Sequence, residues 1–276
     1  MSKAKILYVS QEIEPFLSET IISRISRNLP QGIHEKGKEI RVFTPRFGKI
    51  NERRHQLHEV IRLSGMNLII NDTDHPLIIK VASIPSARMQ VYFIDNEEFF
   101  KRKTTLKDDK GVIQADNDER SIFFIRGVME TVKKLGWVPD VIHCHGSMTA
   151  VLPVYIKSFY NNDPHFANAK VVYSVYENEF EGTFNPQMID KLAFDGIDRK
   201  SVSVVENPTF VNITKLAIQY SDGVVVASDK IDPELRSHIS ERDIPMIECY
   251  AEDNYVGDIS SFYDSILEGK SILVEE

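Results

Sequence analysis

The chain has 276 residues, of which 42% are hydrophobic and 27% are charged, and its formal net charge is −8. This length suits one large α/β domain or two small ones, and the composition excludes disordered and fibrous proteins. Because the net negative charge opposes binding to phosphate backbones and anionic lipid surfaces, we expect neither nucleic acid nor a membrane as a partner.

Short runs rich in β-branched and aromatic residues predict the strands. Several runs are nearly continuous in apolar residues, which is typical of strands that helices cover on both faces. In chain order, the predicted strands are Lys5–Ser10, Glu39–Thr44, Leu77–Ala82, Met89–Ile94, Val138–Cys144, Lys170–Tyr176 and Gly223–Ala227.

Helical spacing of apolar residues predicts helices between these strands. The first has Ser18 as its N-cap and ends near Gly37, and we expect Pro30 to kink or interrupt it. Four further helices are predicted over Asp118–Leu135, Thr149–Phe159, Phe210–Tyr220 and Ser260–Leu267.

This alternation of strands and helices predicts right-handed βαβ units in a mainly parallel sheet with helices on both faces. Residues 48–74 and 101–118 are less periodic and predict surface loops or a small hairpin. Without a repeat or a convincing linker, we expect a single domain. It comprises residues 1–230 and a C-terminal extension over residues 231–276, whose role the sequence does not indicate.

Cysteine usage and the N-terminal segment bear on location. Cys144 and Cys249 are too few for a disulfide framework and belong to no CxxC pair. The opening residues lack the apolar region and cleavage site of a signal peptide, and no run approaches the ~20 apolar residues of a membrane-spanning helix. We therefore expect reduced thiols and a cytoplasmic protein.

Several segments resemble glycogen and bacterial starch synthases, glycosyltransferase family 5, in order and spacing. They are Val9–Ile50, Val91–Lys103, Asp116–Lys157, Val171–Phe184 and Asn212–Ser228. The resemblance implies a Rossmann-like domain of GT-B type. In that architecture the N-terminal domain helps to hold the glucan acceptor, and the C-terminal domain carries most of the ADP-glucose site. We expect this chain to correspond to the N-terminal domain.

The resemblance implies transfer of glucose from ADP-glucose to an α-1,4-glucan. The family carries a Lys-Thr-Gly-Gly-Leu motif after its first strand, where lysine and glycines suit a diphosphate. Here the aligned residues lack the lysine and both glycines, and they introduce a carboxylate that costs ~1 kcal/mol or more beside a phosphate. This altered donor loop argues against ADP-glucose binding. Its residues are Ser18, Glu19, Thr20, Ile21 and Ile22.

A second motif of the family, His-x-His-Asp-Trp followed by a polar residue and threonine, aligns with a predicted strand end. His143, His145 and Thr149 match it, whereas Gly146 and Ser147 replace the aspartate and tryptophan. The strand end favours a ligand site, so the retained residues are candidates for sugar binding. The histidine pair alone also suits a metal, but we expect no metal and no cofactor because no third ligand is identifiable.

A third motif, Thr-Ile-His-Asn, becomes Ser174–Glu177, with Tyr176 in the place of the family's sugar-contacting histidine. Tyr176 and Glu177, with Glu179 and Glu181, form an aromatic and acidic cluster suited to carbohydrate. Solvated loop acids are the alternative interpretation.

Two polar residues near the start of a predicted helix are also candidates for sugar binding. Asn117 and Arg120, with Asp116, could form a ligand site in the cleft. Alternatively, Asp116 or Asn117 caps the helix, and Asp118 and Glu119 stabilise its positive end.

Two functions follow as hypotheses. In the first, the chain is a glycosyltransferase half that is catalytically impaired alone and works with a separate C-terminal GT-B partner. In the second, it is a non-catalytic module, a pseudoenzyme that binds an α-glucan or oligosaccharide, or that pairs with a full-length synthase.

Overall fold

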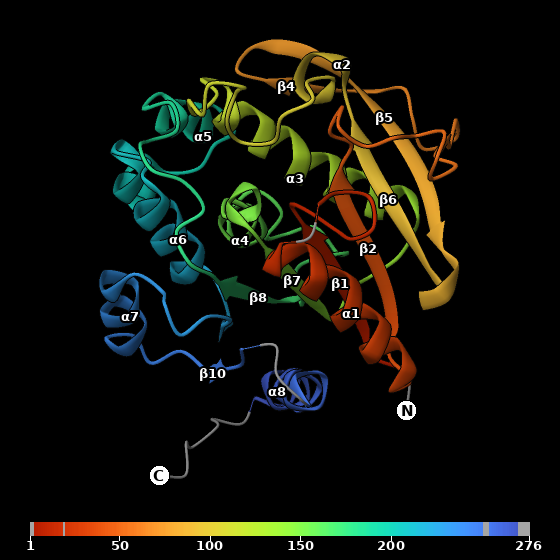
Figure 1. The fold of residues 1–276 in the computed structure, drawn as a ribbon. Helices are drawn as coiled ribbons and strands as arrows, with labels where there is room; N and C mark the ends of the chain where they lie inside the picture. The colour runs from red at the N-terminus through yellow and green to blue at the C-terminus, as the bar shows by residue number, and fades with distance from the viewer. Residues whose placement is uncertain (1–2, 19, 251–253, 270–276) are drawn as a thin grey trace.

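A computed structural model of the protein describes residues 3–18, 20–250 and 254–269. Its main sheet has the strand order β10-β9-β8-β7-β1-β2-β6-β5-β3, and β4 pairs with β5 (Figure 1). The strands are β1 (Lys5–Ser10), β2 (Glu39–Pro45), β3 (His58–Glu59), β4 (Met66–Ile70), β5 (Thr73–Ile84), β6 (Met89–Asp95), β7 (Val141–His145), β8 (Lys170–Val175), β9 (Gly223–Val226) and β10 (Met246–Glu248).

The sheet is parallel from β10 to β6, whereas β5 runs antiparallel to β3, β4 and β6. The predicted mainly parallel sheet is therefore confirmed, and each predicted strand coincides with an observed one. The strand predicted from Val138 begins only at Val141. Val138 is exposed, and Pro139 has no N–H to donate to the sheet.

Helices connect the strands and pack on the sheet. The α-helices are α1 (Ile21–Glu35), α2 (Glu97–Phe100), α3 (Asn117–Lys134), α4 (Leu152–Lys157), α5 (Met188–Phe194), α6 (Phe210–Gln219), α7 (Pro233–Ser240) and α8 (Tyr255–Glu268). Short 3-10 helices are η1 (Pro85–Ala87), η2 (Ser147–Thr149) and η3 (Arg199–Glu206).

The first helix differs from its prediction at both marked positions. Thr20, not Ser18, is the N-cap: its Oγ1 accepts from the Ser23 N–H at 3.0 Å, and its own N–H donates to Ser23 Oγ at 2.8 Å. This reciprocal pair satisfies two backbone donors, which fixes the start of α1. Pro30 does not interrupt α1, because its ring is buried and this packing offsets the missing backbone hydrogen bond.

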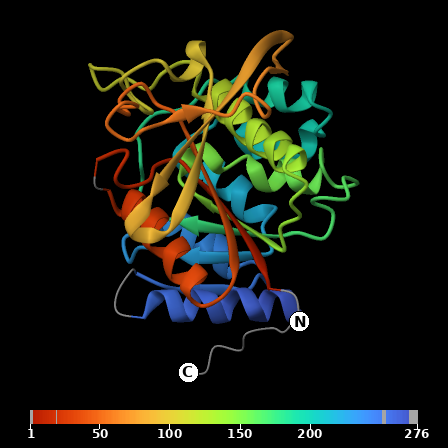
Figure 2. The ribbon, with the colours of Figure 1, turned by 90° about the vertical axis from the view of Figure 1, so that its right-hand side faces the viewer.

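Helices cover both faces of the sheet. The chain passes from β1 through α1 to β2 and later returns through α3 to β7, so right-handed crossovers put α1 and α3 on opposite faces. Helix α8 shares the face of α1, and Figure 2 shows the two helices next to each other. It packs so closely on β9 that a Cβ at Gly223 would lie 2.5 Å from Ile266 Cδ1. Residues after 230 thus form β10, which is a strand of this sheet, and α8, which packs on the sheet.

The two irregular segments lie toward the β5 side and the carboxyl ends of the strands. Residues 48–74 include β3 and β4, and β4 forms a hairpin with β5. Residues 101–116 form a loop closed by an isolated bridge between Lys107 and Ile113. Both outcomes agree with the predicted loops and hairpin, and the second loop borders the site described next.

Candidate binding site

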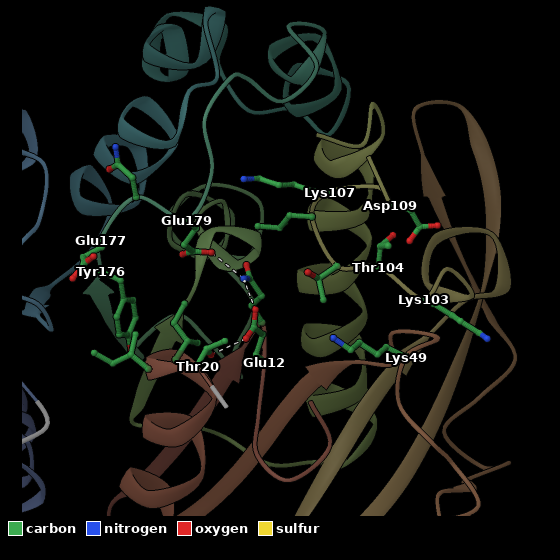
Figure 3. A pocket seen from close by; sticks show the side chains of 16 residues that line it. Glu12, Thr20, Lys49, Lys103, Thr104, Lys107, Asp109, Tyr176, Glu177 and Glu179 are labelled. Atoms are coloured by element: carbon green, nitrogen blue, oxygen red, sulfur yellow. Dashed lines mark hydrogen bonds between the residues drawn. The ribbon is translucent and has the colours of Figure 1, made fainter. Parts of the chain in front are cut away.

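A pocket of about 690 Å³ opens at the carboxyl ends of β1 and β8. Its walls are the end of β1, the first turn of α1, the segment after β8, Lys49 and the loop over residues 103–109 (Figure 3). Strand β1 lies between β2 and β7, to which the chain crosses in opposite directions. Open α/β sheets bind ligands at this switch point.

The start of α1 forms one wall. Ile21 and Ile22 line the pocket, and Thr20 beside them donates from Oγ1 to Glu12 Oε2 at 2.8 Å. The first turn of α1 carries no acidic residue of its own, so Glu12 provides the negative charge beside the positive end of the helix. Ser18 is exposed and does not line the pocket, whereas Glu19 lies outside the described residues.

A hydrogen-bonded network joins the ends of three segments in the pocket wall. Gln11 Nε2 donates to Glu179 Oε2 at 2.9 Å, and the amide oxygen of Gln11 accepts from the Met148 N–H at 3.1 Å and lies 3.1 Å from Ser147 Oγ. Ser147 donates from its N–H to Glu179 Oε1 and from Oγ to Glu179 Oε2, both at 2.9 Å. The network fixes the Glu179 carboxylate at the pocket.

The acids after β8 have different environments. Burial raises the pKa of Glu179 to about 7, opposed by hydrogen bonds from Ser147 and Gln11 and supported by the charge of Glu12. Glu177 lines the pocket but is exposed, and it accepts from Ser228 Oγ at 3.1 Å. Of the loop acids considered from the sequence, Glu179 is the one tied into the pocket wall, whereas Glu181 is exposed.

Basic side chains approach from the opposite wall. Figure 3 shows Lys49 and Lys107 directed toward Glu12 and Glu179, whereas Lys103 points away. The pocket therefore has an acidic wall and a basic wall, a combination that suits a ligand with many hydroxyl groups better than a strongly anionic one.

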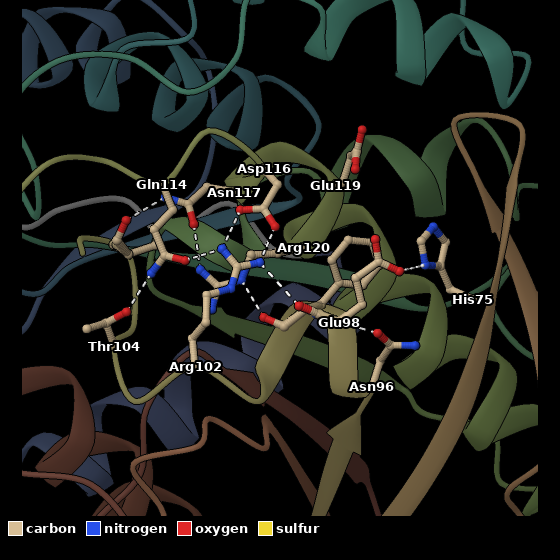
Figure 4. Close-up of polar contacts among 12 residues, drawn as sticks. His75, Asn96, Glu98, Arg102, Thr104, Gln114, Asp116, Asn117, Glu119 and Arg120 are labelled. Carbon is tan, nitrogen blue, oxygen red and sulfur yellow. Dashed lines mark hydrogen bonds and ion pairs between the residues drawn. The ribbon is translucent and has the colours of Figure 1, made fainter. Parts of the chain in front are cut away.

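Asn117 and Arg120 do not line the pocket but support its loop from behind (Figure 4). Both are buried; Asn117 Nδ2 donates to the carbonyl of Leu106 at 2.7 Å, and an Arg120 guanidinium nitrogen donates to that of Thr105 at 2.5 Å. Arg120 Nε also donates to the Phe99 carbonyl at 2.9 Å. Because Thr105 and Leu106 line the pocket, these contacts set the position of that wall.

The alternative interpretation, in which Asp116 or Asn117 caps the helix, holds for the position of Asp116 but not for its side chain. Asp116 is the N-cap residue of α3, but its side chain makes no capping bond and instead pairs with Arg102. Asp118 is buried and binds Lys191 at 2.5 Å, and Glu119 binds the same amine at 2.8 Å. These groups stabilise α3 and its contact with α5.

The two histidines lie behind the pocket in a buried polar row. His143 is hydrogen-bonded through Nδ1 to the Tyr263 hydroxyl at 2.5 Å and through Nε2 to Ser174 Oγ at 2.8 Å. His145 Nδ1 is hydrogen-bonded to the Tyr176 hydroxyl at 2.8 Å. Burial lowers the pKa of His143 and lowers that of His145 to about 3, so both rings are neutral. Tyr176 lines the pocket and is hydrogen-bonded to His145, so it connects the buried row to the pocket.

Thr149 is also buried, and its Oγ1 donates to the Gly146 carbonyl at 2.7 Å. It stabilises the turn after β7 and does not line the pocket. Of the residues considered from the sequence, the pocket brings together Thr20, Ile21, Ile22, Tyr176, Glu177 and Glu179.

Neither a metal site nor a membrane span is found in the part of the chain that the structure describes. No group of three or more His, Cys, Asp and Glu side chains in residues 3–18, 20–250 and 254–269 is arranged to hold an ion. Within the same ranges, no helix is long and apolar enough to cross a bilayer.

The sequence of this chain matches a known protein family. The model of the starch synthase catalytic domain, glycosyltransferase family 5, matches residues 5–244. The chain belongs to this family. The predicted family and its GT-B type α/β fold are thereby confirmed.

Curated members of the family give the extent of the match. The glycogen synthase of Chlorobaculum parvum is 34% identical over 84% of this chain and 47% of its own length. That of Chlorobium limicola is 31% identical over 96% of this chain and 52% of its own. The chain thus spans about half the length of these relatives. The catalytic domain of starch synthase IV from Arabidopsis thaliana, solved with ADP and acarbose, has a similar fold, with a TM-score of 0.72 at 18% identity over 90% of this chain and 51% of that one.

As a member of the starch synthase family, this chain departs from three motifs of that family. The sequence marks Ser147 only as the residue in the place of the family's tryptophan, and it gives Gln11 no direct signal. The signal for both was indirect: a glycine at position 146 leaves space beside β1, which a longer side chain at position 11 fills.

Proposed function

We propose that this starch synthase family domain binds α-glucan in the pocket at the ends of β1 and β8 and does not transfer glucose by itself. Transfer from ADP-glucose would then need a C-terminal GT-B domain in addition to this one. The observation that carries the proposal is the Glu12–Thr20 hydrogen bond at the start of α1.

At this helix end the family motif provides lysine and glycines for a diphosphate. In this chain Thr20 and Ile21 stand in the place of the two glycines, and the Thr20 hydroxyl holds the Glu12 carboxylate at this helix end by a hydrogen bond. A like charge and β-branched side chains both disfavour a diphosphate. Neutral glucan hydroxyls avoid the repulsion and can donate to the carboxylates of Glu12 and Glu179. The solved plant starch synthase domain was bound to both ADP and acarbose, and the second of these is consistent with carbohydrate binding.

Calorimetric titration of the chain with maltoheptaose and with ADP-glucose tests the proposal directly. We expect heat of binding with maltoheptaose and none with ADP-glucose. A parallel assay measures incorporation of labelled glucose into glycogen, first with the chain alone and then with the C-terminal half of the Chlorobium limicola glycogen synthase. Incorporation by the chain alone would refute the proposed lack of catalysis, and absence of maltoheptaose binding would refute the binding function.

A further inference from the structure

The turn after β7 is shaped by the absence of a side chain at Gly146. Its φ is +91°, and a Cβ at this position would lie 2.7 Å from Gln11 Cβ and 3.1 Å from Gln11 Oε1. The side chain of Gln11 therefore occupies the space into which an aspartate at position 146, as in the family motif, would project.

A carboxylate nevertheless reaches this place from the segment after β8. Glu179, in the segment after β8, accepts three hydrogen bonds at 2.9 Å each from the Ser147 N–H, from Ser147 Oγ and from Gln11 Nε2. Two of these bonds reach Oε2, whereas Oε1 accepts only the Ser147 N–H among the described residues. A carboxylate oxygen can accept about two hydrogen bonds, so Oε1 has room for another donor. Glu179 lines the pocket, as Figure 3 shows.

Accordingly, we infer that Glu179 is the carboxylate that binds a glucan hydroxyl in this pocket, in place of the aspartate that Gly146 has replaced. The inference rests on the proposed glucan binding and adds the residue that recognises the sugar. Gln11 and Ser147 are positioning residues, because they hold the carboxylate and do not themselves contribute its charge.

The ionisation of Glu179 gives the inference a specific signature. Its pKa is raised to about 7 by burial and by the charge of Glu12, against the hydrogen bonds from Ser147 and Gln11. Tyr173 and Tyr176 of the β8 region also face it; burial raises the pKa of both, so they stay neutral. Lys107 approaches from the opposite loop. An ionised carboxylate accepts a hydroxyl proton more strongly than a neutral carboxyl, so glucan binding should tighten as pH rises through 7.

The experiment is calorimetric titration of the whole chain with maltoheptaose at pH 5.5, 7.0 and 8.5. For the wild type we expect affinity to rise about tenfold between the extremes, as a charged hydrogen bond of this kind implies. Glu179→Gln should bind about tenfold more weakly at pH 8.5 and show no pH dependence. Glu181→Gln is the matched control, because this exposed acid lies two residues further on and does not line the pocket, and it should behave as the wild type.

The outcomes separate the two proposals. Wild-type binding that is independent of pH, or Glu179→Gln binding as tight as wild type, overturns the role of Glu179 and leaves glucan binding intact. Absence of wild-type binding at every pH overturns the proposed function and with it this inference. If Glu179→Gln loses its folded circular dichroism spectrum, the wild-type pH profile alone decides.

Discussion

Thr20 Oγ1 donates a hydrogen bond to Glu12 Oε2 at 2.8 Å while also accepting one from the Ser23 N–H at 3.0 Å. One threonine thus caps α1 and holds a carboxylate at the helix end where a diphosphate would need amide donors. The glycine that the family motif places at this position can do neither, because it has no side chain.

Rebuilding the family motif should restore donor binding. We predict that, in the presence of the C-terminal half of the Chlorobium limicola glycogen synthase, replacing Ser18–Ile22 by Lys-Thr-Gly-Gly-Leu creates measurable ADP-glucose binding, because it adds a cation and replaces Thr20 and Ile21 by glycines. Calorimetry with ADP-glucose measures the effect. Ser18→Lys alone is the control and should bind the donor more weakly, since the β-branched residues stay. Equal donor binding by the wild type would contradict this account of the loop.

Loss of the guanidinium of Arg120 should destabilise the fold and loosen the pocket loop. Arg120→Met removes the side-chain donor to the Phe99 carbonyl and leaves the Thr105 carbonyl with the Gln114 amide as its remaining side-chain donor, so we predict a loss of about 2–4 kcal/mol in the free energy of unfolding. Urea denaturation measures the loss, and trypsin should cleave faster after Lys107. Arg199→Met, which breaks an exposed pair with Asp190, should cost less than ~1 kcal/mol. Similar losses in the two variants would argue against a buried anchor.

The contact of α8 with β7 should be stabilising. Tyr263→Phe removes the hydroxyl that bonds His143 and leaves a buried ring nitrogen unsatisfied, which should cost about 1–3 kcal/mol in thermal or urea unfolding. Tyr250→Phe removes a hydroxyl from an exposed bond to Glu248 and should change stability by less than ~0.5 kcal/mol. An unchanged stability for Tyr263→Phe would mean that water replaces the lost partner.

Glu179 should also make the stability of the ligand-free protein depend on pH. A carboxyl whose pKa rises from 4.5 to about 7 on folding holds its proton more tightly in the folded state, so its contribution falls as pH rises from 4.5 to 7. His145, whose pKa falls to about 3, acts in the opposite direction below pH 6.5. The melting temperature of the wild type minus that of Glu179→Gln isolates the first effect. This difference should fall between pH 5 and pH 8, and a constant difference would contradict the raised pKa.

Local patterns predicted most of the parallel strands and the larger helices but not α5, α7 or β10, and they predicted long-range partners poorly. The apolar spacing over Phe210–Tyr220 correctly predicts α6 over Phe210–Gln219. Apolar side chains at helical spacing form one face of a helix, and this face is buried in the core. The helix expected over Ser260–Leu267 exists as part of α8, yet nothing nearby in the sequence indicates that Tyr263 meets His143, 120 residues away. Tertiary packing decides such contacts.

The candidate site could likewise be predicted from the sequence only in part. The switch point at the ends of the strands could be predicted from the βαβ order, and the altered motifs could be found by comparison with the family. The roles of Asn117 and Arg120 could not, because two polar residues on a helix look alike whether they face a ligand or a loop carbonyl. Glu177, Glu179 and Glu181 occupy every second position, so the sequence does not distinguish them. Glu179 differs because it is hydrogen-bonded to Gln11 and Ser147.

The packing of α8 against β1, β7 and β9 sets the boundary for any chimaera between this chain and a longer relative. A recombinant fragment that stopped at residue 230 would leave Tyr8, His143 and Gly223 facing water on an open sheet face. A graft of a donor-binding half should therefore be joined after Glu268, so that the exchanged part carries none of the residues that cover this sheet.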